Sequence, residues 1–336
     1  MKRHGNLWNS IIDIDNIREA YLKARRGKTW QKTIKEFDEN MEENLLYIQY
    51  LLKTKTLKTS EYRLKNIHEP KERVIYILPF SPDRIVQHAL MNVIAPIWDD
   101  LMIHDSYACR PGKGQHRASR KTMESVKKYD FCYQGDIKKF YPSIKHDILM
   151  EIVKNKIKDS NVLWLLEDII YSIDGGKNIP IGNFTSQWLG NLYLNELDMY
   201  VKHELKIKNY IRYNDDFCLF HNDKEYLRNC RSKIEEFVAK KLDLIVSKQK
   251  LFPVQLGVDF IGYRHFPEKV LLRKSTAKRM KKKIAMKVHS YRKGIISAKQ
   301  LEASLQSTKG WLIWAQTYNY RKAINLDVLL EEVQSA

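Results

Sequence analysis

The chain has 336 residues, of which 43% are hydrophobic, and its 59 Lys and Arg residues outnumber 40 Asp and Glu residues to give a formal net charge of +19. This hydrophobic share allows a sizeable core spread over roughly two or three domains and argues against a disordered chain. The basic excess favours a polyanionic partner, because each Lys or Arg that docks on a phosphate releases condensed counterions. The alternative is a soluble protein that is merely basic.

Neither the cysteines nor the N-terminal residues indicate zinc binding or export. The first residues contain no uninterrupted apolar stretch of the kind found in a signal peptide, and no stretch approaches the roughly 18 apolar residues that span a membrane. We therefore expect a cytoplasmic protein without a membrane segment. Free thiols in a reducing compartment are the simplest interpretation of four cysteines without zinc-ligand spacing, which are Cys109, Cys132, Cys218 and Cys230.

The N-terminal third is predicted to be helical, then stranded, then helical again. Apolar residues recur at helical spacing over residues 1–60, with the basic segment 23–28 as a loop between helices. Alternation over residues 62–78 suggests strands. Residues 83–98 form an amphipathic pattern with Asp83 near its start, as is typical of a helix N-terminus.

The middle of the chain alternates strands and helices around a breaker-rich loop at residues 175–183. Residues 131–136 read as a short apolar strand that ends in an acid, and residues 209–223 read as strand, tight turn and strand. The remaining expected elements are helices over 145–171, 186–205 and 224–241, and a strand or hairpin over 258–266.

The composition changes after Pro267. Residues 269–294 contain eleven Lys or Arg residues and no acid, which predicts a basic helix that tracks phosphates rather than a merely solvated helix face. The rest of the chain is expected to be helical. Its aromatic residues are interpreted as helix-packing residues rather than base-stacking platforms, and they are Trp311, Trp314, Tyr318 and Tyr320.

The strongest local signal is the run Tyr213-Asn-Asp-Asp-Phe217 between two apolar segments. Asn and Asp tolerate the backbone angles of a tight hairpin turn, so this composition alone is also ordinary for a turn. Two adjacent acids, Asp215 and Asp216, at a hairpin tip between buried strands are costly without a cation.

A second acid, Asp136 in Gln-Gly-Asp-Ile-Lys-Lys-Phe-Tyr, lies where a strand gives way to a turn. Alone it could be a helix cap. Nucleotidyl transfer, however, needs two Mg²⁺ ions about 4 Å apart, and carboxylates from two strands can bridge such a pair. One acid on a first strand and a pair on a later hairpin match that layout.

In this order the motifs resemble those of a reverse transcriptase palm, continuing with Ile181-Gly182-Asn-Phe-Thr-Ser-Gln187 and Gly257-Val-Asp-Phe-Ile-Gly-Tyr263. Upstream, Lys-Glu-Arg-Val-Ile (71–75) and Ser-Tyr-Ala-Cys-Arg-Pro-Gly-Lys-Gly (106–114) resemble its fingers. Most relatives have Gln-Gly-x-x-x-Ser-Pro where this chain has Ile-Gly-x-x-x-Ser-Gln, which is the form of diversity-generating retroelement reverse transcriptases.

The resemblance implies an α+β right-hand polymerase whose palm is an antiparallel sheet backed by helices. Its expected parts are an N-terminal helical segment (1–60), fingers (61–130), a palm with part of the fingers (131–266) and a helical thumb (267–336). The implied activity is RNA-directed DNA synthesis from a template RNA and a primer, with dNTPs, two Mg²⁺ ions and Mn²⁺ as a substitute. The retroelement family also implies errors at template adenines and a small basic accessory protein that forms a ring.

The resemblance assigns residues to these tasks. Asp136, Asp215 and Asp216 would be catalytic, and Ile137 would add a carbonyl to the metal site. Tyr141 resembles the steric gate that excludes a 2′-OH, and the alternative is that it is a core aromatic. Lys71 could equally be an exposed charge of the fingers, and Ile181 could be an apolar anchor of its loop. Lys248 is nearly as well placed as Lys250 for the role given to Lys250. The nucleotide-binding set is Lys71, Arg73, Lys139, Phe140, Tyr141, Ile181, Gly182, Gln187 and Lys250. The primer- and template-binding set is Tyr213, Phe260, Ile261, Gly262, Tyr263, Lys281, Lys282 and Lys283.

Two rival interpretations remain. Another bacterial reverse transcriptase, of group II intron, retron or phage-defence type, would share the same palm motifs. A non-catalytic RNA-binding cofactor on a polymerase scaffold is disfavoured by the intact acids Asp136, Asp215 and Asp216.

Overall fold

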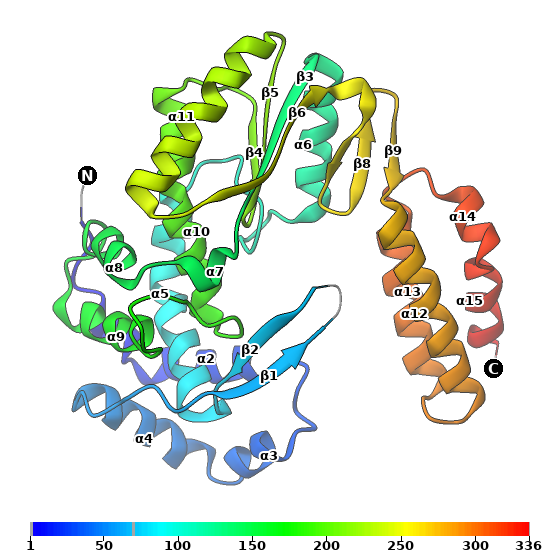
Figure 1. The fold of residues 1–336 in the computed structure, drawn as a ribbon. Coiled ribbons are helices and arrows are strands. Elements are labelled where there is room, and N and C mark those ends of the chain that lie inside the picture. The colour runs from blue at the N-terminus through cyan, green and yellow to red at the C-terminus, as the bar shows by residue number, and fades with distance from the viewer. Residues whose placement is uncertain (1–2, 69–70, 336) are drawn as a thin grey trace. The chain divides into compact units, whose positions relative to one another are not determined.

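The computed structural model describes residues 3–68 and 71–335 (Figure 1). The chain forms two compact units, each assembled from three separate segments. The first unit comprises Met1–Pro111, Asp136–Lys206 and Ser232–Ser247, and the second comprises Gly112–Gly135, Ile207–Arg231 and Lys248–Ala336. The domain boundaries expected from the sequence follow the chain more simply, and they stay a prediction.

Helices and strands alternate through most of the described residues (Figure 1). The helices are α1 Trp8–Ile11, α2 Ile14–Arg25, α3 Lys32–Glu39, α4 Met41–Lys53, α5 Ile85–Leu101, α6 Gln115–Lys128, α7 Phe140–Ser143, α8 His146–Lys154, α9 Ser160–Ile170, α10 Phe184–Met199, α11 Lys224–Leu242, α12 Lys274–Arg292, α13 Ala298–Leu312, α14 Tyr318–Ala323 and α15 Leu326–Gln334. The strands are β1 Arg63–Ile67, β2 Arg73–Ile77, β3 Phe131–Ile137, β4 Tyr210–Tyr213, β5 Asp216–His221, β6 Val246–Pro253, β7 Val258–Phe260, β8 Tyr263–Phe266 and β9 Lys269–Leu272.

The first unit is built around α5, which packs against α2 and α10. Ile17, Tyr21 and Trp98 are fully buried there, because apolar residues at helical spacing place one face of α2 and of α5 in the core. The side chain of Asn16 ties the helices together by donating to the carbonyl oxygens of Ile11 and Ala89. A two-stranded antiparallel sheet, β1–β2, belongs to the same unit, with Arg63 paired to Ile77 and Ile67 to Arg73.

The second unit contains two sheets. One has the strand order β4-β5-β3-β6 and the other the order β7-β8-β9. The ring of Tyr133 on β3 meets the ring of Phe217 on β5 edge-on, with 5.9 Å between the ring centroids, and both rings are fully buried. Two residues after Tyr133 on β3 lies Gly135, where a Cβ would come within 2.5 Å of the Phe217 ring. Glycine at this position therefore lets β3 lie close against the Phe217 ring.

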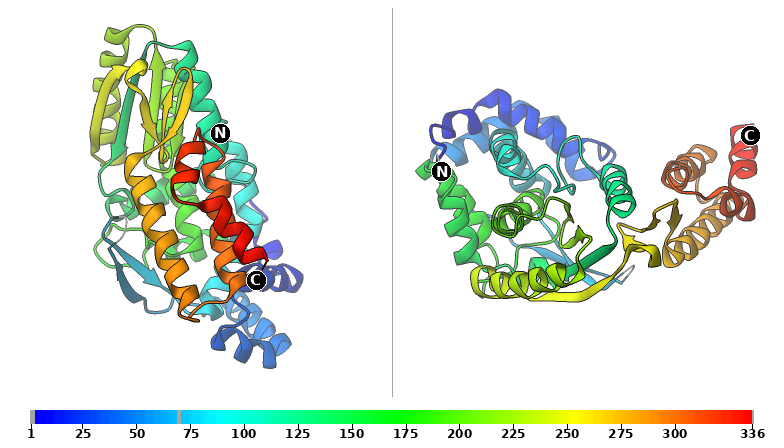
Figure 2. Two further views of the ribbon diagram at one scale, coloured as in Figure 1. Left: turned by 90° about the vertical axis from the view of Figure 1, so that its right-hand side faces the viewer. Right: turned by 90° about the horizontal axis from the view of Figure 1, so that it is seen from above.

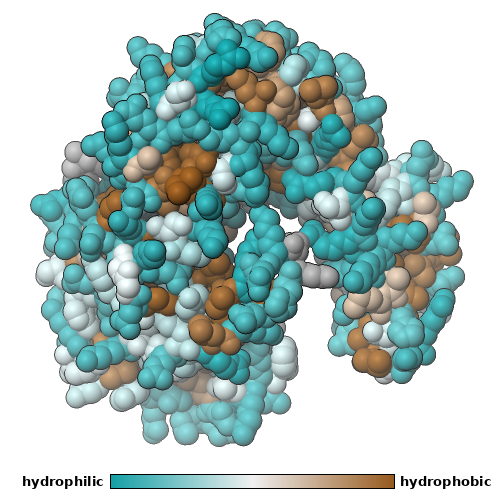
Figure 3. All heavy atoms as spheres, viewed as in Figure 1, coloured by the Kyte–Doolittle hydropathy of each residue, from teal (hydrophilic) through white to brown (hydrophobic). Residues whose placement is uncertain are grey.

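The C-terminal helices have a core of their own. Helix α13 packs against both α12 and α15, and two views show the helices lying alongside one another (Figures 1 and 2). Figure 3 shows hydrophilic residues over most of the visible surface, with hydrophobic residues in separate patches. The buried residues of this helical core are Ile284, Leu301, Leu305, Leu312, Leu326, Leu330 and Val333.

Most of the expected elements are confirmed. The region 145–171, expected to be helical, contains two helices, because residues 155–159 leave helical geometry before Asp159 caps α9 by accepting from the amides of Asn161 and Val162. Residues 269–272, expected as the start of a basic helix, form β9 and pair with β8. Strand β6 and helix α6 were not expected. None of the described helices is both long and apolar enough to cross a bilayer.

Candidate functional site

The hairpin of β4 and β5 carries the adjacent acids Asp215 and Asp216. The strands are antiparallel with Tyr213 paired to Asp216, so Asn214 and Asp215 form the two-residue turn expected from the sequence. Asn214 has φ 54°, a left-handed conformation that Asn tolerates. The buried Arg212 donates to the carbonyl oxygen of Asn214 at 3.0 Å, which supports the turn from below.

Asp136 lies near the end of β3 and is only 7% exposed. It is not a helix cap, since the capping position of the next helix, α7, is Lys139 with φ 46°. Residues Phe131–Gly135 of β3 belong to the same sheet as the hairpin, and β3 is the strand next to β5. The Ser247 hydroxyl donates to the backbone carbonyl oxygen of Asp136 at 3.1 Å, so this hydrogen bond does not involve the Asp136 carboxylate.

The expected metal ligands offer hard oxygen donors, but the described residues show no preformed metal cluster. Within residues 3–68 and 71–335, no group of three or more His, Cys, Asp and Glu side chains is arranged to hold a metal ion. Carboxylates such as those of Asp136, Asp215 and Asp216 are the ligands that Mg²⁺ prefers, so the donor chemistry fits. The side chain of Ile137 is buried, and the predicted role of its carbonyl remains a prediction.

The expected sugar-gate residue, Tyr141, is half-buried, whereas its neighbour Phe140 is buried. A Cβ on Gly190 of α10 would come within 3.1 Å of the Phe140 ring and 3.2 Å of the Tyr141 ring. The absence of a side chain at Gly190 thus lets α10 approach both rings. The structure places Phe140, and not Tyr141, as the core aromatic of this pair.

The loop that carries Ile181 and Gly182 is held against β2. Ile181 is half-buried, and its carbonyl oxygen accepts from the amide of Tyr76 at 2.8 Å. The buried Ser186 hydroxyl donates to the carbonyl oxygen of Pro180 at 2.7 Å, and Gln187 is exposed one residue later. The sequence alone did not reveal that a fingers strand contacts this loop.

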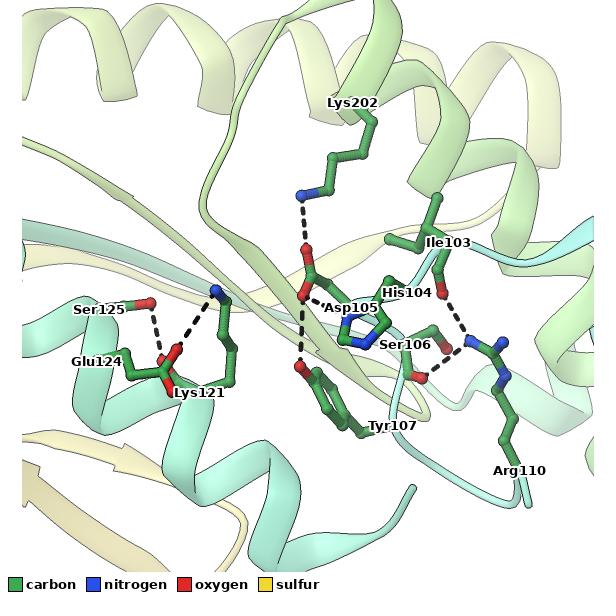
Figure 4. Close-up of polar contacts among 10 residues, drawn as sticks. All are labelled: Ile103, His104, Asp105, Ser106, Tyr107, Arg110, Lys121, Glu124, Ser125 and Lys202. Atoms are coloured by element: carbon green, nitrogen blue, oxygen red, sulfur yellow. Dashed lines mark hydrogen bonds and ion pairs between the residues drawn. The ribbon is translucent and has the colours of Figure 1, made fainter. Parts of the chain in front are cut away.

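The fingers motifs divide into an exposed part and a structural part. Lys71, just before β2, and Arg73, the first residue of β2, are exposed. The side chain of Arg110, in contrast, is 5% exposed and forms an ion pair with Asp99 at 2.5 Å. Arg110 also donates to the carbonyl oxygens of Ile103 and Ser106, so it closes the loop between α5 and Pro111 (Figure 4).

A second ion pair joins Asp105 of that loop to Lys202, in the segment after α10, at 2.8 Å (Figure 4). The Tyr107 hydroxyl donates to the same carboxylate at 3.3 Å. Because both charged side chains are largely buried, losing one partner would leave a costly unpaired charge. Tyr107 and Arg110 of the 106–114 motif therefore stabilise the structure of this loop.

The β7–β8 hairpin, the expected primer grip, has a half-buried turn that is flanked by a buried aromatic pair. Phe260 and Tyr263 are paired and buried, whereas Ile261 and Gly262 form the turn with φ 48° and 86°. A Cβ on Gly262 would come within 2.7 Å of Trp311. Glycine at position 262 therefore lets the turn lie close against the Trp311 ring.

Trp311 holds this hairpin from the thumb helices. Its ring stacks on the Tyr263 ring with 4.5 Å between centroids, and its carbonyl oxygen accepts from the Tyr263 hydroxyl at 2.9 Å. From α6, the Gln115 side chain donates to the carbonyl oxygen of Ile261 at 3.0 Å. The expected packing role of Trp311 is confirmed, and its partner is the hairpin rather than another helix.

A buried hydrogen-bond chain gives Trp314 a similar packing role. The Trp314 indole N–H donates to Ser119 Oγ at 2.7 Å, and Ser119 Oγ lies 2.7 Å from His265 Nε2. His265 Nδ1 lies 3.2 Å from the carbonyl oxygen of Val258, which can only accept. Nδ1 is therefore the protonated nitrogen, and Nε2 accepts from Ser119. The sequence analysis missed Ser119 and His265, because neither belongs to a recognisable motif.

Two further expected groups keep accessible positions. Lys250 lines a cavity of about 590 Å³ together with Gln134 and Asp259, and the Gln134 side chain donates to the Asp259 carbonyl oxygen at 2.8 Å. Lys248, the alternative to Lys250, has φ 49° on the same strand. On α12, the predicted duplex contacts Lys281, Lys282 and Lys283 are exposed, as are Lys274 and Lys278.

Comparison with known proteins agrees with the motifs. Residues 63–265 match the family model described as reverse transcriptase (RNA-dependent DNA polymerase). The chain is 27% identical to Protein YkfC of Escherichia coli (strain K12), covering 56% of this chain and 61% of YkfC. It is 25% identical to the group II intron-encoded protein LtrA of Lactococcus lactis subsp. cremoris, covering 52% of this chain and 31% of LtrA.

Among solved structures, the chain is similar to telomerase from Candida albicans in complex with a fragment of telomeric RNA. The TM-score is 0.48 with 11% sequence identity, and the match covers 87% of this chain and 65% of that chain. The chain spans less than two thirds of the length of the curated relatives and of this structure.

The buried His265 generates a prediction about pH and stability. Burial lowers the pKa of His265 to about 4, opposed by its hydrogen bond to Val258, whereas an unfolded histidine titrates near 6.5. The unfolded chain therefore binds the proton first, and the free energy of unfolding falls as the pH drops from about 6.5 to 4. At pH 5 this loss is about 2 kcal/mol relative to pH 7.

Urea denaturation of the wild type, His265→Asn and His289→Asn at pH 7 and pH 5 checks this expectation. His265→Asn should lose less stability than the wild type between the two pH values. His289 is exposed on α12, so His289→Asn should retain the wild-type difference. Equal pH dependence in all three proteins would contradict a neutral buried His265.

Proposed function

Because the chain belongs to the reverse transcriptase family, we propose that it is an RNA-directed DNA polymerase that copies a template RNA into cDNA by two-metal nucleotidyl transfer. Its mixed helix-and-sheet architecture is the right-hand polymerase fold of that family. The observation that carries the proposal is the pair of adjacent acids on the β4–β5 hairpin, with Asp215 in the turn and Asp216 at the start of β5, the strand next to β3 with Asp136 near its end.

The three carboxylates are proposed to be the catalytic residues and the metal ligands. Asp136 lies one residue before the end of β3, a strand with buried residues, and the hairpin turn is supported by Arg212, so the acids need little reorganisation. When bound, two Mg²⁺ ions, or Mn²⁺ in their place, supply activation of the primer 3′-hydroxyl and charge neutralisation at the pyrophosphate.

The nucleotide is proposed to bind to residues that lie mostly in the first unit, together with Lys250 of the second unit. Arg73, with a planar guanidinium, and Lys71 would bind the triphosphate, and the amides of Lys139 and Phe140 would add donors. The half-buried Tyr141 ring would exclude a 2′-hydroxyl. The loop of Ile181, Gly182 and Gln187 would contact the base pair, and Lys250 would assist the leaving pyrophosphate.

The primer and template are proposed to bind mainly to the second unit. The Ile261–Gly262 turn would contact the primer strand, with Phe260 and Tyr263 acting from inside the hairpin. Tyr213 would lie near the primer end. The exposed Lys281–Lys283 segment of α12 would contact duplex phosphates, because lysine binds phosphate as a point charge.

For the subtype, we propose a diversity-generating retroelement enzyme that errs at template adenines and works with a small basic ring-forming protein. Ile181 and Gln187 are the residues that support this subtype. The similarity to LtrA, a group II intron-encoded protein, favours an intron-type enzyme as the second candidate. The flanking DNA distinguishes them: two near-identical repeats that differ at adenines are expected only for the retroelement.

The first test addresses the carboxylates. Asp136→Asn and Asp215→Asn should each abolish RNA-templated primer extension with dNTPs and Mg²⁺ while RNA binding persists, since a neutral amide cannot balance the charge of two cations. Asp174→Asn, at an exposed acid in the loop after α9, is the matched control and should extend normally. Near-normal extension by either active-site variant would remove the assignment, and inactivity of the wild type would favour the RNA-binding cofactor.

The second test addresses the thumb. Replacing Lys281, Lys282 and Lys283 together with Gln should weaken template–primer binding and reduce its salt dependence, by about one unit of slope for each lost phosphate contact. The same replacement at the exposed Lys35, Lys53 and Lys58 is the charge-matched control. Fluorescence anisotropy over a range of salt concentrations measures both. Identical slopes for the two triple variants would show that α12 has no special part in binding.

The third test addresses errors at adenine. A Gln at position 181 can hydrogen-bond the nascent pair or its surroundings, whereas Ile supplies only packing. A mispair that leaves such a polar group without its hydrogen bond is disfavoured by about 1–3 kcal/mol. Ile181→Gln should therefore lower misincorporation opposite template adenine roughly tenfold or more. Ile181→Val should keep the wild-type error rate. Sequencing cDNA made on one RNA decides, and an unchanged adenine error rate in an active Ile181→Gln enzyme would exclude Ile181 from the mechanism.

A further inference from the structure

Tyr76 on β2 holds both ends of the Asn178–Gly182 loop, although no motif assigns it a role. Its backbone amide donates to the Ile181 carbonyl oxygen at 2.8 Å, on the edge of β2 that is not paired with β1. Its phenol oxygen accepts from the side-chain amide of Asn178 at 2.9 Å. One residue thus contacts the loop at two points, three positions apart.

The loop and the strand touch backbone to backbone. Gly182 has φ +131°, and a Cβ built there would overlap the carbonyl oxygen of Tyr76. Only a glycine allows this approach, because any side chain at 182 would push the loop off β2. The hydrogen bond between Tyr76 and Ile181 therefore depends on a close contact that leaves the loop little freedom.

Asn178 connects the same loop to the segment that bears Tyr141. Its backbone amide donates to the carbonyl oxygen of Ile144 at 3.0 Å, and the next amide, of Ile179, donates to the carbonyl oxygen of Tyr141 at 3.0 Å. The buried side-chain oxygen of Asn178 has no donor within the described part of the chain, so the phenol of Tyr76 is the polar group that orients this amide.

A second tyrosine, Tyr62, supports the arrangement from just before β1. Its hydroxyl lies 2.8 Å from Ser172 Oγ and accepts from the Asn183 side chain at 2.9 Å. The rings of Tyr62 and Tyr76 meet edge-on with 5.6 Å between centroids. The β1–β2 hairpin is thus joined to the loop by two tyrosine hydroxyls and one backbone bond.

The consequence is a mechanical connection between three groups that the proposed function assigns to the nucleotide. Arg73 lies on the same strand as Tyr76, three residues earlier. The Ile181 carbonyl oxygen accepts a hydrogen bond from the Tyr76 amide, and the Tyr141 carbonyl oxygen accepts one from the Ile179 amide of the same loop. A shift of the hairpin must therefore move the loop, or else break hydrogen bonds that are partly buried.

We propose that Tyr76 is a positioning residue for nucleotide selection. It fixes the position of the Asn178–Gly182 loop relative to the β1–β2 hairpin. The residues proposed to contact the triphosphate, the sugar and the base pair then keep one fixed arrangement. This inference rests on the proposed polymerase function and assigns Tyr76 and Asn178 to its specificity. Tyr76 acts through Ile181 and Tyr141 and does not itself touch the nucleotide.

The test is Tyr76→Phe, which removes the hydroxyl and keeps the ring and the backbone bond. Steady-state single-nucleotide incorporation should show a KM for the correct dNTP raised about three- to tenfold, the loss expected for one hydrogen bond, with kcat nearly unchanged. Discrimination against ribonucleotides and against mispaired dNTPs should fall together by a similar factor. Template–primer affinity and melting temperature should stay near the wild-type values.

Two further variants separate this role from general damage. Tyr50→Phe removes a hydroxyl from an exposed tyrosine on α4 of the same unit and should leave every parameter unchanged. Asn178→Ala should reproduce the Tyr76→Phe effects, and the double variant should be no worse than either single one, because both remove the same bond. Unaltered KM and discrimination in an active Tyr76→Phe enzyme would overturn the inference, as would a loss confined to kcat.

A measurement without catalysis keeps this inference separate from the proposed function. Amide hydrogen exchange of the nucleotide-free protein should be faster at residues 178–183 in Tyr76→Phe than in the wild type, and equal in Tyr50→Phe. A wild type that incorporates no nucleotide would overturn the polymerase proposal. Unchanged protection of residues 178–183 in Tyr76→Phe would overturn the role of Tyr76 in holding the loop.

Discussion

The close packing of β3 against the Phe217 ring is the constraint on which the candidate catalytic residues depend. Tyr133 meets Phe217 edge-on, and Gly135 leaves no room for a Cβ beside the same ring. Side chains alternate along a strand, so burying Tyr133 and Gly135 on one face directs the next residue, Asp136, to the other. Asp216 precedes Phe217 on β5 and is directed away from the buried face by the same alternation. A slip of one residue in either strand would bury a carboxylate among aromatic rings.

The candidate functional turns of this protein are half-buried, and each is held by hydrogen bonds or ring contacts from neighbouring residues. The Asn214–Asp215 turn rests on the buried Arg212, the Ile261–Gly262 turn on Gln115 and Trp311, and the Ile181 loop on Tyr76. A turn that presents backbone to a ligand cannot be stabilised by its own burial, so neighbouring elements must supply the hydrogen bonds. Apart from Arg212, which is two residues from Asn214, these supporting residues come from distant parts of the chain. They lie outside the motifs, yet they determine the geometry in which the motifs can act.

Many residues support the assignment to the reverse transcriptase family, whereas only two support the retroelement subtype. Membership among reverse transcriptases follows from a match over residues 63–265 and from acids on two neighbouring strands. The retroelement subtype depends on Ile181 and Gln187 alone, and the curated relatives include a group II intron protein. Ile181 is half-buried with its carbonyl bonded to β2, which is compatible both with an anchor for the loop and with a part in base-pair selection.

The sequence alone determined the helices and strands with strong periodicity, the tight turn that carries Asp215 and the family, because these depend on local patterns and on residues in fixed order. It also indicated the packing role of Trp311 and Trp314, but not their partners. Only the tertiary structure decided that Arg110 is a buried scaffold residue, that Phe260 and Tyr263 point inward, and that residues 269–272 form an edge strand. The contacts of Tyr76, Ser119 and His265 were likewise beyond the sequence. Each joins residues 100 or more positions apart, and no local pattern records which distant backbone a side chain will meet.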